Sequence, residues 1–181
     1  MKNEKTGLFR ELPFSHFYSY RIPRDSREIL SPETIYMQKK TEFAATRREG
    51  RILCFQSLYS YEVDKTSLDE LLKFKWLEEP VSDQSIAYAK KIITGTINNL
   101  DKIDDLIKEK LINWNFDRIS LVDKSILRFS VYSMLFAADP VPAKVIINEA
   151  VEIVKKFGAD DSYKFINGIL DAIKKTQKPG S

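Results

Sequence analysis

The chain has 181 residues, of which 43% are hydrophobic and 30% charged, and its formal net charge is +3 at pH 7. These values are typical of a globular protein with a sizeable core and exclude a fibrous or low-complexity chain. No apolar run approaches the roughly 18 residues that a membrane-spanning helix needs, and the amino end lacks the apolar centre of a signal peptide. The single cysteine, Cys54, cannot form an intramolecular disulfide, so we expect a cytoplasmic protein with no membrane contact.

The charge is unevenly distributed along the chain. Residues 1–51 contain 11 Lys and Arg against 7 Asp and Glu, whereas the other 130 residues contain 18 against 19. The positive excess therefore lies at the amino end, which favours a polyanionic partner, although basic leaders are often only solvated tails.

The first predicted elements lie at the amino end. Residues 1–44 read as a partly ordered extension that is rich in aromatic residues, and Ser31-Pro32-Glu33 indicates a short helix near residues 32–42 within it. The capping box Thr46-Arg47-Arg48-Glu49 then predicts the first helix of a body that spans residues 45–178.

The body continues as a series of helices. Capping boxes begin at Ser67 and Ser120, a cap stands at Ser82 or Asp83, and a further helix follows Asn99. The helix after Ser120 is apolar on nearly every side, which predicts a central position. Two more helices follow, one between Pro142 and Gly158 and one capped within residues 160–162. The fold class is all-α, with about seven helices.

The last helix contains an unusual pair, Asn167-Gly168, in its middle. Glycine inside a helix costs about 1 kcal/mol relative to alanine, so a compensating role is expected. We expect Gly168 to serve close packing of this helix on a neighbour, while Asn167 helps to orient the helix.

The residues that most enzymes use are sparse in this chain. The one histidine, His16, lies in the extension, and Cys54 lies within a predicted helix, so a Cys/His pair is not expected. Metal-binding spacings and a phosphate-binding glycine loop are missing, and the carboxylate pairs 104–105 and 160–161 are expected to be solvated structural groups. We therefore expect no enzyme, no metal and no cofactor.

Three arginines, Arg47, Arg48 and Arg51, fall on the first turns of the helix predicted from Thr46. Positive side chains at a helix start oppose the helix dipole, so a cluster there indicates an outside partner. Arginine binds phosphate through paired hydrogen bonds and stacks on bases. The alternative is a solvated face whose charge Glu49 partly compensates.

Aromatic residues with polar neighbours occur near the carboxyl end. Phe157 precedes Gly158, and Asp161 lies one turn before Phe165. Unpaired RNA bases stack on aromatic rings, and a carboxylate accepts hydrogen bonds from base amines. The alternative is that both phenylalanines belong to the core.

Four segments together resemble the NusB family of bacterial transcription antitermination factors. They are TRREGRILCFQSLYSYE, SLVDKSILRFSVYSMLF, VPAKVIINEAVEIVKKFG and DDSYKFINGILD, which occur in the family's order over residues 45 to about 175. The resemblance implies two small helical subdomains. It also implies binding to the boxA element of ribosomal RNA leader transcripts together with small-subunit ribosomal protein ten (NusE), in a complex with RNA polymerase that ignores termination signals.

The resemblance also implies roles for particular residues. Those expected to contact RNA are Arg47, Arg48, Arg51, Phe157, Asp161 and Phe165, and those expected on the side of the ribosomal protein are Tyr59 and Asp123. The chain departs from the family pattern at Glu49 and Gly50, at Ser133, and in the short side chain of Asp123. The oligomeric state stays open between monomer and homodimer, and the alternative function is a helical protein-interaction module without RNA contact.

Overall fold

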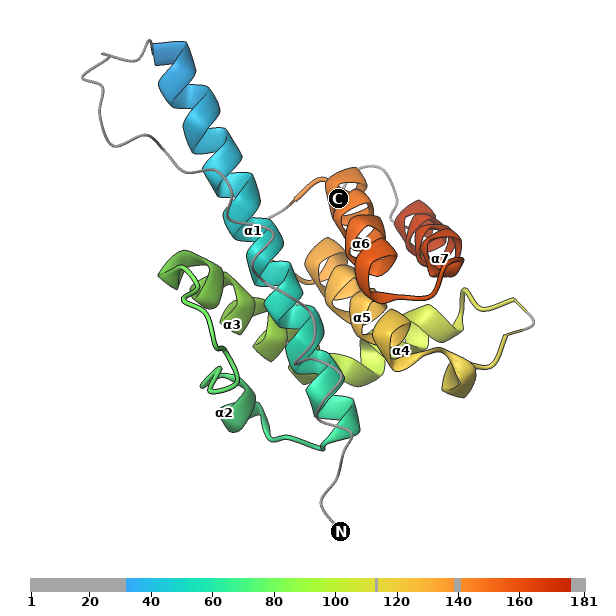
Figure 1. Cartoon of the computed structure of the whole chain (residues 1–181). Coiled ribbons are helices and arrows are strands. Elements are labelled where there is room, and N and C mark those ends of the chain that lie inside the picture. The colour runs from blue at the N-terminus through green and yellow to red at the C-terminus, as the bar shows by residue number, and fades with distance from the viewer. Residues whose placement is uncertain (1–31, 113, 139–140, 177–181) are drawn as a thin grey trace.

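The computed structural model describes residues 32–112, 114–138 and 141–176. Within them the chain forms seven α-helices, one short 3-10 helix and no strand (Figure 1), which confirms the predicted all-α class. The helices are α1 (Pro32–Val63), α2 (Leu68–Leu71), α3 (Asp83–Asn98), α4 (Leu100–Lys108), η3 (Phe116–Arg118), α5 (Leu121–Leu135), α6 (Ala143–Phe157) and α7 (Ser162–Thr176). None of these helices combines the length and the apolar character that crossing a bilayer requires.

Helix α5 is the centre of the molecule, as its all-round apolar sequence predicted. It packs against α1, α3, α4, α6 and α7, and every residue from Asp123 to Ser133 is buried. Figure 1 shows α5 with α1 on one side and α6 and α7 on the other. The core therefore forms around one helix, and the charged surface is carried by those that surround it.

Helix α1 is a single helix of 32 residues, so the predicted break before Thr46 is wrong. Its first half projects beyond the body in Figure 1, where the side chains from Tyr36 to Ala45 are exposed, and most residues from Gly50 to Leu58 are buried. The capping box fails because the residues before Thr46 are already helical. The predicted boundary between residues 44 and 45 falls inside this helix, and the division into extension and domain stays a prediction.

Other predicted helix starts are confirmed by their hydrogen bonds. The hydroxyl of Ser67 accepts from the backbone N–H of Glu70, Ser82 from that of Ser85, and Ser120 from that of Asp123. The choice between Ser82 and Asp83 is thereby settled in favour of Ser82.

Gly50 allows α1 and α3 to approach each other closely. A Cβ atom at this position would lie 2.5 Å from the ring of Tyr88 and 3.0 Å from the backbone oxygen of Ser85. Ser85 also donates a 3.1 Å hydrogen bond to the backbone oxygen of Thr46. Gly50, which departs from the family pattern, therefore has a role in the packing of α1 on α3.

Gly168, in contrast, has no packing role within the described chain, so our explanation for it is wrong. A Cβ atom built on it meets nothing within 4 Å, and both Gly168 and Asn167 are exposed on α7.

Candidate nucleic-acid interface

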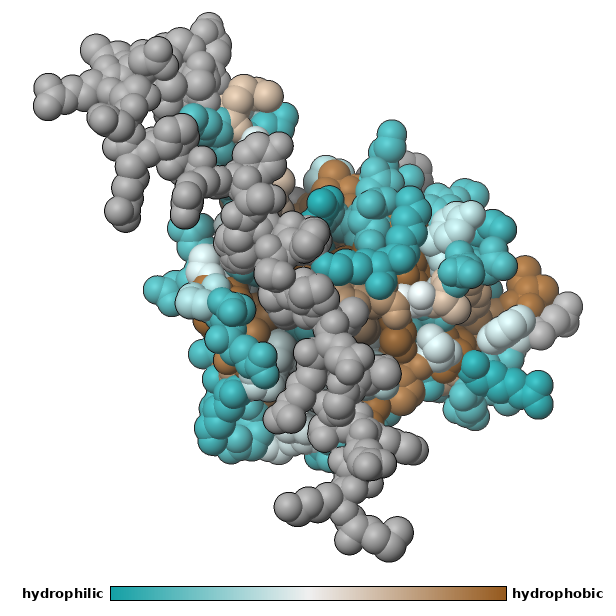
Figure 2. All heavy atoms as spheres, in the orientation of Figure 1, coloured by the Kyte–Doolittle hydropathy of each residue, from teal (hydrophilic) through white to brown (hydrophobic). Residues whose placement is uncertain are grey.

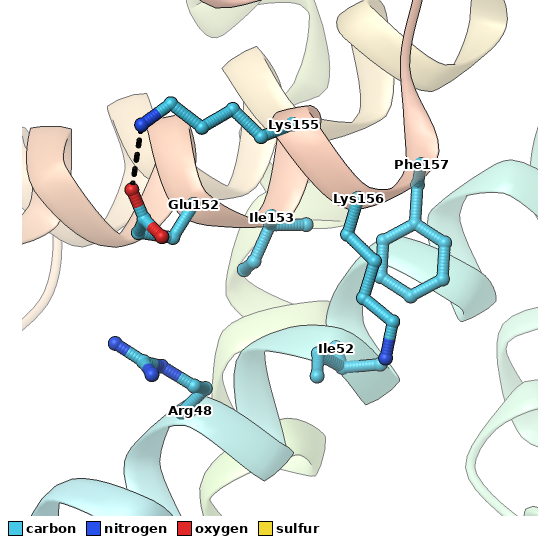
Figure 3. A pocket seen from close by; sticks show the side chains of 7 residues that line it. All are labelled: Arg48, Ile52, Glu152, Ile153, Lys155, Lys156 and Phe157. Atoms are coloured by element: carbon cyan, nitrogen blue, oxygen red, sulfur yellow. Dashed lines mark hydrogen bonds and ion pairs between the residues drawn. The ribbon is translucent and has the colours of Figure 1, made fainter. Parts of the chain in front are cut away.

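A groove of about 390 Å³ lies between α1 and α6. Figure 3 shows the side chains that line it: Arg48, Ile52, Glu152, Ile153, Lys155, Lys156 and Phe157. The fold thus brings together Arg48 and Phe157, two of the residues predicted to contact RNA. The groove has three cationic side chains, one carboxylate and an aromatic ring, a combination suited to a phosphate backbone and its bases.

Arg48 is held at the groove by Glu149 of α6. Its Nε donates to Oε2 at 3.0 Å and its second terminal nitrogen donates to Oε1 at 2.7 Å. The hydrogen bonds to Glu149 raise the pKa of Arg48, and 46% of its side chain stays exposed. Arg48 is therefore a pre-oriented, solvent-accessible guanidinium.

Two lysines complete the basic lining. Lys155 forms a 2.9 Å ion pair with Glu152, and the ammonium of Lys156 lies 5.3 Å from the centre of the Phe157 ring. Burial lowers the pKa of Lys156. On the face seen in Figure 2, hydrophilic side chains cover the outer side of α6, and hydrophobic surface lies below them in the view.

Arg47 is half-buried and lies beside two aromatic rings instead of the groove. Its guanidinium carbon is 4.8 Å from the centre of the Phe43 ring and 4.4 Å from that of Tyr88. Such cation–π contacts fix the direction of the side chain.

Arg51 is buried, with 4% of its surface exposed. One terminal nitrogen lies 3.7 Å from Oε2 of Glu149, and the guanidinium carbon lies 5.8 Å from the centre of the Tyr88 ring. Arg51 therefore supports the surface from beneath and does not present its guanidinium to a ligand.

The three carboxyl-terminal candidates occupy different surroundings. The ring of Phe157 is 5.0 Å from that of Phe55, and the half-buried ring of Phe165 is 6.1 Å from that of Trp114. Asp161 is exposed and pairs with Lys164 at 2.8 Å. Phe157 lines the groove, whereas the seven lining residues do not include Asp161 or Phe165.

The two residues expected on the protein-partner side differ in accessibility. Tyr59 is half-buried, with its ring 6.4 Å from that of Phe55. Asp123 is buried, and its Oδ2 accepts a 3.0 Å hydrogen bond from the hydroxyl of Ser162. Asp123 therefore joins the starts of α5 and α7.

Sequence reasoning missed Lys155, Lys156 and Glu149. The two lysines could have been found from the sequence, because they directly precede Phe157. They also stand in the last turn of a predicted helix, where the helix dipole stabilises positive charge. Glu149 could not be inferred from local spacing, since its partner Arg48 is 101 residues away. Glu149 is a carboxylate that compensates Arg48 and Arg51, and Glu49 accepts a 3.5 Å hydrogen bond from Ser82.

Comparison with known proteins places the chain in a family. A family model described as NusB family matches residues 48–175. The transcription antitermination protein NusB of Treponema denticola is 47% identical over 130 residues, which cover 71% of this chain and 95% of that protein. NusB of Geobacter sp. strain M21 is 43% identical over 139 residues, with 72% and 95% covered.

Solved structures agree with the family match. NusB of T. maritima superposes with a TM-score of 0.67 at 39% identity, covering 74% of this chain and 93% of that one. A chain from a crystal structure of antitermination factors NusB and NusE in complex with double-stranded RNA gives 0.61 at 25% identity, with 72% and 97% covered. The chain therefore belongs to the NusB family of transcription antitermination proteins, which are regulatory factors and not enzymes.

Proposed function

We propose that this chain binds the single-stranded boxA element of ribosomal RNA leader transcripts together with NusE, the small-subunit ribosomal protein ten. In the bacterial cytoplasm, this complex joins RNA polymerase and lets it pass termination signals. The observation that carries the proposal is the groove in which Arg48, Lys155, Lys156 and Phe157 converge. The similar chain from the structure of NusB and NusE in complex with double-stranded RNA supports RNA and NusE as partners.

The geometry suggests how the groove binds RNA. Glu149 occupies the Nε edge of Arg48, and the other terminal nitrogen of this exposed guanidinium can donate to a phosphate oxygen. Lys155 and Lys156 add positive charge beside it, and Phe157 offers a ring edge for a base. Asp161 and Phe165 extend the proposed contact onto the start of α7, where Asp161 accepts hydrogen bonds from base amines.

The proposed roles of Arg47 and Arg51 are indirect. Arg47 borders the surface beside Phe43, and Arg51 holds Glu149 in place from below. For NusE, we propose contact through Tyr59, with Asp123 acting through its hydrogen bond to Ser162 and not by direct contact.

Fluorescence anisotropy of a labelled boxA-like RNA, with and without NusE, tests the proposal. Arg48→Ala should weaken RNA binding by about tenfold, which is the order expected for the loss of one charge-assisted contact. The same substitution should lower the free energy of unfolding by at most about 1 kcal/mol. Lys102→Ala removes an equally positive, exposed charge on α4 and should leave affinity unchanged within about twofold. RNA affinity that does not respond to Arg48→Ala would remove Arg48 from the site. No detectable RNA binding by the native chain, with NusE still bound, would favour the interaction module without RNA contact.

Salt dependence provides a second test of the same interface. If about three phosphates are neutralised, the logarithm of affinity should fall against the logarithm of salt with a slope near −2, because single strands contribute about −0.7 for each phosphate. A slope near zero would exclude phosphate contacts in the groove.

A further inference from the structure

The exposed first half of α1 carries a stripe that alternates aromatic and cationic side chains. Tyr36, Lys40, Phe43 and Arg47 stand at intervals of four, three and four residues, so they share one face of the helix. Tyr36 is 65% exposed and Phe43 is 58% exposed. We call these four residues the α1 stripe.

The charge of this segment favours an anionic ligand. Residues 36–47 contain three cations, Lys39, Lys40 and Arg47, and one carboxylate, Glu42, which the helical period places away from the α1 stripe. Within the described part of the chain, Lys39 and Lys40 are exposed and form no ion pair. An exposed stripe whose purpose was only solubility would not need two large aromatic rings.

The α1 stripe and the candidate groove lie on different sides of α1, toward α3 and α6 respectively, and are linked by a chain of side-chain contacts. The guanidinium of Arg47 lies over the rings of Phe43 and Tyr88, and Tyr88 lies beside Arg51. Arg51 in turn approaches Glu149, which pairs with Arg48 of the groove. Figure 1 shows that the same helix runs from the body out to this exposed half. The family match begins at residue 48, after the last member of the stripe.

We propose that the α1 stripe is an additional single-stranded RNA contact, which binds nucleotides that flank those held in the groove. Bases stack on the rings of Phe43 and Tyr36, while Lys39 and Lys40 contact phosphates. The two rings are seven residues apart, or about 10 Å along the helix axis, which suits about two to three nucleotides. This inference rests on the proposed function and extends its binding site.

Two RNAs separate this inference from the function on which it rests. One is a boxA-like strand of about eight nucleotides, and the other is the same strand lengthened by about four nucleotides at either end. In the full-length protein, the double substitution Tyr36→Ala and Phe43→Ala should weaken binding of one lengthened RNA by at least about tenfold, since stacking contributes about 1–3 kcal/mol for each base. Binding of the short RNA should stay within about twofold.

Gln38→Ala is the matched control, because Gln38 is exposed on the opposite side of the same helical turns. It should leave both affinities unchanged. Photo-crosslinking of 4-thiouridine in the added nucleotides should label the peptide that contains residues 36–43.

Each other outcome overturns the inference. If the short RNA binds but the double substitution changes the affinity of neither lengthened RNA, the α1 stripe is not an RNA contact and the proposed function stands. If neither RNA binds, the proposed function and the inference fail together. If the double substitution converts a dimer into a monomer in sedimentation without changing RNA affinity, the stripe is a surface for self-association.

Discussion

Arg48 and Arg51 reach the same carboxylate from different depths. Burial raises the pKa of Glu149, but the hydrogen bonds and charge of Arg48, with the charge of Arg51, outweigh burial and leave this pKa below its usual range. Glu149 is therefore ionised at neutral pH and holds two guanidinium groups. Only the guanidinium of Arg48 stays accessible, so one helical turn separates the proposed RNA contact from the residue that supports it.

Gly168 gives a prediction about stability. Because open space surrounds it within α7, Gly168→Ala should raise the free energy of unfolding by about 0.5–1 kcal/mol, through helix propensity and lower entropy of the unfolded chain. Gly50→Ala is the contrasting variant and should destabilise, because its Cβ would clash with Tyr88. Urea denaturation measures both. A stability loss in Gly168→Ala would show that this glycine is needed for the fold itself.

At the scale of elements, local hydrogen bonding decides what the sequence could predict. Ser67, Ser82 and Ser120 follow non-helical residues, so their hydroxyls are free to cap and the predicted starts are confirmed. The box at Thr46 follows the same pattern as those at Ser67 and Ser120, a hydroxyl residue with a carboxylate three positions later. A helix that already runs through Thr46, however, leaves no unpaired N–H groups there to cap.

The candidate site shows the same division between local and distant information. The Arg48 and Phe157 positions could be predicted from the family resemblance, which carries information about the fold. Their surroundings could not be predicted, because the partner of Arg48 comes from another helix and the depth of Arg51 depends on how α1 packs on α3 and α5. The solvated role expected for Asp104 is also wrong, since Asp104 pairs with buried Arg128.

The continuity of α1 gives a prediction about its exposed half. Ala45→Pro removes one backbone hydrogen bond and clashes with the preceding turn, but proline is tolerated at the first turn of a helix. We expect the body to stay folded with α1 restarting near residue 45, while the far-UV helical signal of residues 32–44 falls. Ala45→Gly, which costs only about 1 kcal/mol, is the control. Global unfolding of the proline variant would show that the exposed half contributes to the core.

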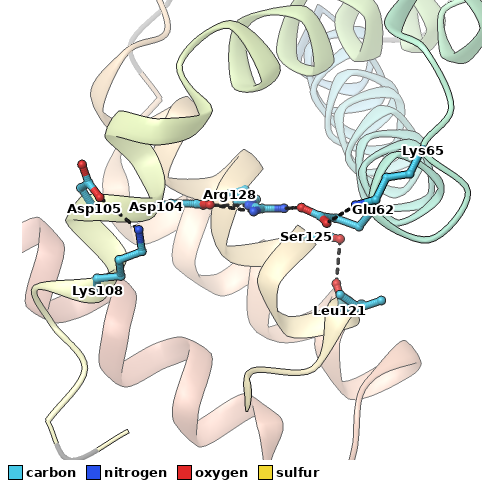
Figure 4. A network of polar contacts seen from close by, with 8 residues as sticks. All are labelled: Glu62, Lys65, Asp104, Asp105, Lys108, Leu121, Ser125 and Arg128. Carbon is cyan, nitrogen blue, oxygen red and sulfur yellow. Dashed lines mark hydrogen bonds and ion pairs between the residues drawn. The ribbon is translucent and has the colours of Figure 1, made fainter. Parts of the chain in front are cut away.

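At the scale of the whole molecule, one buried guanidinium joins three helices. Arg128 of α5 donates to both carboxylate oxygens of Asp104 on α4, at 2.8 and 2.7 Å, and to Glu62 on α1 (Figure 4). Only 5% of the Arg128 side chain is exposed, against 19% for Glu62 and 14% for Asp104. Burial lowers the pKa of Arg128, but the hydrogen bonds and charges of the two carboxylates outweigh it, so the net shift is upward.

Arg128→Met should destabilise the protein by about 3–5 kcal/mol at pH 7, because it leaves two partly buried carboxylates without their cation. Arg118→Met, at an exposed arginine of η3, is the control and should change stability by less than about 0.5 kcal/mol. Chemical denaturation measures both. A loss for Arg128→Met no larger than that for Arg118→Met would mean that packing, and not this network, positions α1 and α4 around α5.

The pH dependence of the same variant identifies the charge as the cause. In the native protein, burial raises the pKa of Glu62, but Arg128 outweighs burial and the net pKa is lowered, so this stabilisation is present above about pH 4.3 and is lost as pH falls through the folded pKa. Without Arg128, burial dominates and the pKa of Glu62 rises. Lys65, which is 3.4 Å from Glu62, is 78% exposed and compensates little. A folded-state pKa of Glu62 above its unfolded value destabilises the folded variant at high pH, where the carboxylate is ionised. This destabilisation decreases as pH falls and Glu62 becomes protonated. The stability gap between Arg128→Met and the native protein should therefore narrow between pH 7 and pH 5, and a constant gap would assign the loss to packing alone.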